Sequence, residues 1–98
     1  MPRKRAQQAY DYAERVRARL PQRLRAALRA KNMTPCGLEQ ESGISRQMIY
    51  RVLNGQSKGV SVFVMAQMSA GAGMTLTEYA QGLEDDAEGE GRESVNDV

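Results

Sequence analysis

A chain of 98 residues has room for one domain with terminal extensions, since single domains usually hold about 100 to 150 residues. Its hydrophobic residues make up 41% but nowhere approach the roughly 20 consecutive apolar residues of a membrane span, and the basic N-terminus lacks a signal-peptide core, so we expect a soluble, cytoplasmic protein with no membrane contact. The net charge of +2 conceals an asymmetry, because ten Lys and Arg stand against two acidic residues in 1–31, and one stands against eight in 61–98. A basic N-terminal third, here called the basic front, favours binding to a polyanion such as nucleic acid. A solvated, arginine-coated helix is an equally good interpretation.

The first predicted element is a leader helix preceded by a basic arm. Apolar residues three and four positions apart mark the stripe of this helix: Ala9, Tyr12, Ala13, Val16 and Leu20. The arm before it consists of Arg3, Lys4 and Arg5. Because proline is tolerated in the first turn of a helix but not in its interior, Pro21 indicates that a second helix starts there. We therefore assign residues 1–19 to the basic arm and leader helix. The second helix carries the apolar residues Leu24, Ala27 and Leu28.

Two short helices joined by a tight turn are predicted next. The first has Thr34 as its N-cap and Pro35 in its first turn, and it ends at Gly43, a residue that readily adopts the left-handed conformation of a helix exit. The second begins at Ser45, a good N-cap, and extends to Asn54.

Two further helices complete the predicted domain. Ser61 caps a helix whose buried stripe we expect to consist of Val62, Met65, Ala66 and Met68. Thr75 and Glu78 have the capping-box spacing, and the helix that they start reaches about Leu83. No segment alternates with a period of two for long enough to indicate a strand, so we predict an all-α domain over residues 20–83.

The remaining segment, 84–98, has the composition of a disordered acidic tail. Seven of its fifteen residues are acidic, and only three are apolar. Such a segment cannot bury enough surface to offset the conformational entropy lost on ordering. We expect no fixed structure there.

The stretch 34–55 has the spacing of a helix-turn-helix, in which a tight turn lets the second helix stand out from the domain. The residues that carry this pattern are Leu38, Gly43, Ile44, Ser45, Ile49, Val52 and Asn54-Gly55. With them the stretch resembles the phage Cro/cI-type repressor family, also called the XRE family, and the resemblance extends through residues 75–79. It implies a five-helix lambda-repressor-like bundle, here with an extra leader helix and an acidic tail, that binds double-stranded DNA as a homodimer.

The chain departs from the family pattern at three places. Glu39 stands where the family usually has a small alanine packed close to the second helix, so its carboxylate must turn outward or find a partner. Pro35 replaces a polar residue that commonly contacts phosphate. Leu28 and Leu53 fall where some members bury an ion pair, so packing replaces that pair here.

The helix 45–54 separates into two faces that predict a DNA-reading surface. Ile49, Val52 and Leu53 share the inward face, and the opposite face carries Arg46, Gln47, Tyr50, Arg51 and Asn54. Arginine can present its fork to the N7 and O6 atoms of guanine, and glutamine pairs similarly with adenine. By resemblance, the base-contacting positions are Arg46, Gln47 and Arg51. Met48 contacts either a thymine methyl group or the edge of the core.

Contacts to the DNA backbone are expected from the residues around this helix. Tyr50 and Asn54 lie on its outward face, and Lys58 lies in the following loop, where the family commonly meets phosphates. The arm residues Arg3, Lys4 and Arg5 either follow a groove or form a solvated terminus. An exposed tyrosine is as often inert as it is a phosphate ligand.

These patterns favour a sequence-specific DNA-binding transcriptional regulator, a repressor by resemblance. The alternative is an antitoxin-like or adaptor module that uses the same fold to hold a protein partner. An enzyme is the weakest interpretation, because the chain has no histidine, no glycine-rich phosphate loop and a single cysteine, Cys36. The same inventory predicts no metal, no cofactor and no internal disulfide. The dimer surface is either the last helix, with Met74, Leu76 and Tyr79, or the leader helix, with Tyr12 and Val16.

Overall fold

The computed structural model describes residues 2–84, with side chains from residue 4 onward. Within this range the chain forms α1 (Pro2–Ala18), α2 (Leu20–Ala30), α3 (Pro35–Ser42), α4 (Arg46–Leu53), α5 (Val62–Gly71) and a last helical segment over 76–84. No strand occurs among the described residues, so the all-α prediction is confirmed for them. The expected disordered tail lies outside the described residues, except for Glu84, which belongs to the last helical segment.

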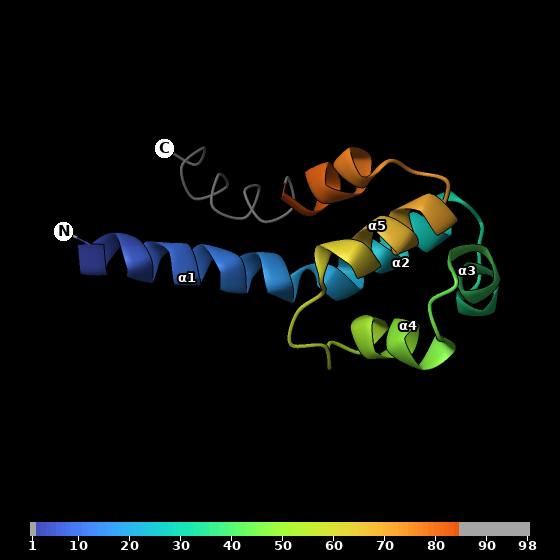
Figure 1. Cartoon of the computed structure of the whole chain (residues 1–98), viewed down its shortest axis with the longest axis horizontal. Helices are drawn as coiled ribbons and strands as arrows, with labels where there is room; N and C mark the ends of the chain where they lie inside the picture. Colours follow the sequence, from blue (N-terminus) through green and yellow to red (C-terminus); the bar gives the residue numbers. More distant parts are fainter. Residues whose placement is uncertain (1, 85–98) are drawn as a thin grey trace.

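The first helix starts earlier than the sequence pattern predicts. It begins at Pro2 instead of near Ala9, so Lys4 and Arg5 belong to a helix and not to an extended arm. Proline is well suited to the first helical turn, because its missing N–H would have no partner there. Figure 1 shows α1 projecting away from the other helices, and residues 4–11 are all exposed. The predicted boundary at the end of α1 is confirmed, since the chain turns at Arg19 and Pro21 lies in the first turn of α2.

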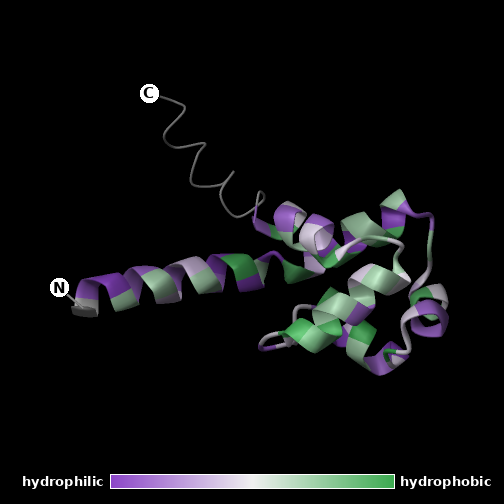
Figure 2. Cartoon of the chain, turned by 45° about the horizontal axis from the view of Figure 1, so that its top comes forward, coloured by the Kyte–Doolittle hydropathy of each residue, from purple (hydrophilic) through white to green (hydrophobic). Residues whose placement is uncertain are grey.

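The core forms where α2 and α4 pack together and α3 packs on α4 and α5. Its aliphatic side chains include Leu20, Leu24, Leu28, Leu38, Ile44, Ile49, Val52, Leu53 and Met68. Figure 2 shows the hydrophobic residues concentrated among the packed helices, whereas the projecting half of α1 is largely hydrophilic. Leu28 and Leu53 are both buried in this core, as the expected packing of these two side chains requires.

One prediction about α5 is wrong. Val62, expected in the buried stripe, is 73% exposed, as is its neighbour Phe63 at 74%. Met68 is buried, and Met65 and Ala66 are half-buried, so the stripe begins one turn later than expected. Val62 is the first residue of α5. Because helical side chains point toward the N-terminus, a residue in the first turn reaches past the end of its helix, where there is less to pack against.

The backbones of α3 and α5 approach each other closely at Gly71. A Cβ atom there would lie 2.6 Å from the Cβ atom and 2.9 Å from the Cα atom of Ser42. The Gln67 amide adds a hydrogen bond of 3.2 Å to the Ser42 carbonyl oxygen. Ser42 directly precedes the turn between α3 and α4, so α5 holds α3 at the end from which that turn starts.

The last helical segment is fixed by its cap and by Arg23 of α2. The predicted capping box is confirmed, with Thr75 and Glu78 each accepting the other's backbone N–H at 3.0 Å. The Thr75 N–H and the Thr75 hydroxyl, which donates to the same carboxylate oxygen at 3.2 Å, hold the pKa of the Glu78 carboxyl below its usual value. Arg23 donates to the carbonyl oxygen of Tyr79 at 2.9 Å and lies 4.9 Å from the centre of its ring. Tyr79 is fully buried, which removes it from the dimer surface considered above.

Replacing Gly71 with alanine should destabilise the domain despite the better helix propensity of alanine. The added methyl group would overlap the backbone of α3, so we expect a loss of about 1–3 kcal/mol in the free energy of unfolding. Urea denaturation checks this through a lower midpoint at an unchanged slope. Gly59→Ala is the matched control, because a Cβ at Gly59 meets nothing within 4 Å. Equal stability of Gly71→Ala and the wild type would contradict the close packing of α3 on α5.

Tyr79→Phe should change how stability depends on alkaline pH. Burial raises the pKa of Tyr79 from 10.0 to about 12, although the Arg23 charge opposes this. Below pH 10 the hydroxyl is protonated in both states. Between pH 10 and 12 the unfolded chain loses its proton first, so the native state loses roughly 3 kcal/mol of stability. The hydroxyl has no hydrogen-bond partner within residues 2–84.

Without that hydroxyl, Tyr79→Phe should be as stable as the wild type at pH 7 or more stable by about 1 kcal/mol. The variant should also lack the part of the stability loss between pH 10 and 12 that comes from ionisation of the Tyr79 hydroxyl. Urea denaturation from pH 8 to 12 measures both effects. Tyr10→Phe is the control, because it removes the same hydroxyl from a side chain that is 63% exposed. Identical alkaline profiles for Tyr79→Phe and Tyr10→Phe would contradict the burial of the Tyr79 hydroxyl.

Candidate nucleic-acid interface

The turn between α3 and α4 has the predicted geometry. Gly43 adopts a left-handed conformation with φ of 80°, and its N–H donates to the Glu39 carbonyl oxygen at 2.9 Å. Ile44 is buried and anchors the turn in the core. The Ser45 hydroxyl then accepts the N–H of Met48 at 3.2 Å, so Ser45 is the N-cap of α4 as expected. The turn thereby sets where α4 begins.

The two faces of α4 separate as the sequence pattern predicts. Ile49 and Val52 are fully buried, and Leu53 is 9% exposed. The opposite face is exposed and carries the residues expected to contact DNA: Arg46, Gln47, Tyr50, Arg51 and Asn54. Asn54 is the C-cap of α4. Met48 is half-buried and packs against the core, which favours its interpretation as a core-edge residue.

Glu39 provides a contact that the spacing of the motif does not predict. Its carboxylate reaches from α3 to the first turn of α4, where Oε2 accepts the backbone N–H of Arg46 at 3.0 Å. The other oxygen, Oε1, forms an ion pair of 3.3 Å with Arg46 Nε. The carboxylate therefore has the partner that the sequence requires, and it adds a second cap beside Ser45. A negative charge at this position also interacts favourably with the α4 dipole.

Arg25 of α2 is a second residue whose role the sequence pattern does not reveal. Its guanidinium donates to the Leu53 carbonyl oxygen at 3.0 Å, at the C-terminal end of α4. A cation suits this end of the helix, because the last carbonyl groups lack partners within the helix. The apolar stripe of α2 is the only sequence signal that bears on Arg25, because it places Arg25 next to the buried Leu24. The stripe does not identify the carbonyl group to which Arg25 donates.

Other arginines of the basic front also bind the rest of the chain. Arg17 pairs with Glu14 one turn earlier at 2.6 Å and keeps the pKa of that carboxyl below its usual value. Arg23 holds the last helical segment, as described above. Some of the positive charges of residues 1–31 therefore take part in ion pairs and hydrogen bonds within the fold. Lys4 and Arg5 are exposed in the first turn of α1, and Arg3 lies in the same turn, its side chain outside the described part.

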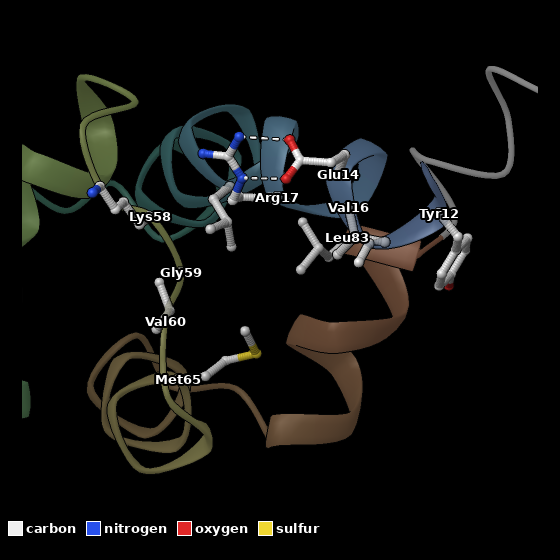
Figure 3. A pocket seen from close by; sticks show the side chains of 11 residues that line it. Tyr12, Glu14, Val16, Arg17, Lys58, Gly59, Val60, Met65 and Leu83 are labelled. Carbon is white, nitrogen blue, oxygen red and sulfur yellow. Dashed lines mark hydrogen bonds and ion pairs between the residues drawn. The ribbon is translucent and has the colours of Figure 1, made fainter. Parts of the chain in front are cut away.

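Lys58 is exposed in the loop between α4 and α5. The Ser57 hydroxyl shapes this loop, because it donates to the Gly59 carbonyl oxygen at 2.7 Å and accepts the Gly59 N–H at 3.3 Å. Lys58 also lines one end of a groove of about 450 Å³ between α1, the loop, α5 and Leu83 (Figure 3). The groove brings Lys58 near Val16 and Arg17 at the end of α1. The loop between α4 and α5 lies on the side of the molecule where α4 ends (Figure 1).

The described residues contain no group of three or more His, Cys, Asp or Glu side chains that could hold a metal ion. Within the same range, every helix is too short or too polar to cross a membrane. Comparisons with models of known protein families, with curated proteins and with solved structures find no match for this chain. The interpretation of the α3–α4 region therefore depends on the geometry and residues given above.

Proposed function

We propose that this chain is a sequence-specific DNA-binding transcriptional regulator of the Cro/cI type, with a lambda-repressor-like fold. It acts as a repressor in the cytoplasm and reads the major groove of double-stranded DNA with α4. The observation that carries the proposal is the exposed face of a short, doubly capped helix that holds Arg46, Gln47 and Arg51 while its other face is buried.

Charge supports the same proposal. The helix α4 itself carries no acidic residue, and of the two carboxylates on α3, Glu39 is paired with Arg46. Lys58 and the exposed Lys4 and Arg5 supply cations that can meet phosphates. Among the expected backbone contacts, Tyr50 is 47% exposed, so its hydroxyl is free to reach a phosphate. Because Lys4 and Arg5 extend α1 as a helix, they would approach DNA on a rigid element and not as a flexible arm.

The proposed regulator is a homodimer, because one recognition helix covers too few base pairs, and paired helices read half-sites about 34 Å apart. Of the last helix, Leu76 is exposed and Tyr79 is buried, so that surface keeps only part of its expected residues; α1 is the other candidate surface. Its Tyr12 and Val16 are half-buried beside the groove of Figure 3.

The protein-interaction alternative has one observation in its favour. The groove is lined mainly by apolar side chains, among them Val16, Val60, Met65 and Leu83, and the exposed Val62 and Phe63 follow Val60 in the chain. Exposed apolar surface often marks a protein contact. This surface is compatible with either a dimer or an adaptor function.

An electrophoretic mobility shift with random duplex DNA separates the two functions. A regulator should bind at low ionic strength and lose affinity steeply with added salt. Selection of bound sequences from a random pool should then yield a symmetric site. Absence of any salt-sensitive binding would eliminate the regulator proposal and favour the adaptor.

Arg51→Ala should relax the base preference of the protein at one position of the selected site. Each good arginine–guanine pair contributes about 1–3 kcal/mol of discrimination, so we expect about a 5- to 150-fold loss of preference there. Competition binding with single-base variants of the site measures it. Arg29→Ala removes the same charge from α2 and should leave the preference unchanged. If Arg51→Ala discriminates as well as the wild type, Arg51 does not read a base.

Lys58→Ala should weaken binding by a similar factor on every sequence, because a phosphate contact carries no base information. The slope of log K against log salt should become shallower by about one unit. Titrations at several salt concentrations give this slope. Lys31→Ala, which removes an exposed lysine at the end of α2, serves as the control. An unchanged slope for Lys58→Ala would place Lys58 away from the phosphates.

A further inference from the structure

The contact between Glu39 and Arg46 joins a carboxylate to a residue of the proposed reading face. Arg46 is half-exposed, with 56% of its side-chain surface accessible, and Glu39 is less so, with 33% accessible. The backbone bond to Arg46 N–H and the ion pair to Nε use both carboxylate oxygens. Glu39 therefore holds the first residue of α4 at two points, one on its backbone and one on its side chain.

The position of the Glu39 carboxylate determines which nitrogen atoms of the Arg46 guanidinium remain able to donate hydrogen bonds to DNA. The carboxylate lies at Nε, and within residues 2–84 neither Nη group of Arg46 has an acceptor. The two Nη groups form the end of the guanidinium fork, whose parallel N–H bonds match the N7 and O6 atoms of guanine. A guanidinium oriented in this way loses less rotational freedom when it binds.

The charge of Glu39 is a second observation that bears on DNA binding. A carboxylate on a DNA-binding surface repels phosphates, so it weakens binding to every sequence. On α3, Glu41 is exposed and forms no hydrogen bond or ion pair with Arg46, which makes it a reference for the charge alone. The geometry of Glu39, unlike that of Glu41, couples its charge to the side chain that would read the first base.

We propose that Glu39 is a positioning residue that orients Arg46 for guanine at the base pair facing the start of α4. The inference rests on the proposed DNA-binding function. Glu39 thereby lowers the affinity for DNA of any sequence and raises the selectivity at one base pair. The DNA sites that this protein prefers carry guanine at that base pair.

The test uses the full chain and a site selected from a random DNA pool. Affinity is measured for this site and for versions in which each base pair is replaced in turn. Arg46→Ala identifies the base pair that Arg46 reads, as the position where discrimination disappears. Glu39→Gln is the central variant, because its amide oxygen can still accept the Arg46 N–H and preserve the cap while the ion pair is lost. Glu41→Gln is the control for the change in charge.

For the wild type and Glu41→Gln we expect at least 10-fold preference for guanine at the Arg46 position. Glu39→Gln should reduce it to about 2-fold, leave the Arg51 position unchanged and bind random DNA more tightly. In an Arg46→Ala background, Glu39→Gln should have no further effect on selectivity, since the two residues act as a unit. Thermal unfolding establishes that each variant is folded at the assay temperature.

The outcomes separate the two levels of the proposal. If Glu39→Gln keeps the wild-type preference at the Arg46 position, or if the preferred base there is not guanine, the positioning inference is overturned while the regulator stands. If the wild type binds no DNA, the regulator proposal fails and the inference fails with it.

Discussion

The packing of α4 on α2 is the contact on which the candidate interface depends. Ile49 and Val52 are fully buried there, so the rotation of α4 about its axis is set by its apolar face. Side chains at the intervening positions must then point outward. The exposed position of Arg46, Gln47 and Arg51 is therefore a consequence of core formation and needs no separate stabilisation.

The two ends of α4 are held by charged groups of opposite sign from two neighbouring helices. Glu39 of α3 accepts an N–H at the start of α4, and Arg25 of α2 donates to a carbonyl oxygen at its end. Both match the helix dipole and satisfy groups that lack partners within the helix. An eight-residue helix is marginal in isolation, so these contacts and the buried face together account for its position.

The surface of α1 and the groove beside it form the part of the molecule least explained by the DNA-binding proposal. The first half of α1 is exposed, and its second half contributes Tyr12 and Val16 to the groove. Leu83 lines the groove beside Val16 (Figure 3) and comes from the segment that Arg23 and the buried Tyr79 hold in place. This mainly apolar groove next to a projecting helix is the surface that the proposed dimer, or the partner of the alternative adaptor, would use.

The sequence by itself determined the helices and most of their ends, because caps and proline act within a few residues: Ser45, Thr34 and Pro21 all have their predicted roles. The start of α1 is the exception, since it lies at Pro2 and not near Ala9. It also determined the two faces of α4, since the helical period separates them. Only the tertiary structure decided the partners of Glu39, Arg23 and Arg25, and the burial of Tyr79 and exposure of Val62. These depend on how helices distant in sequence meet, and a long charged side chain or a residue at a helix end has no periodic signal that reveals what lies opposite it.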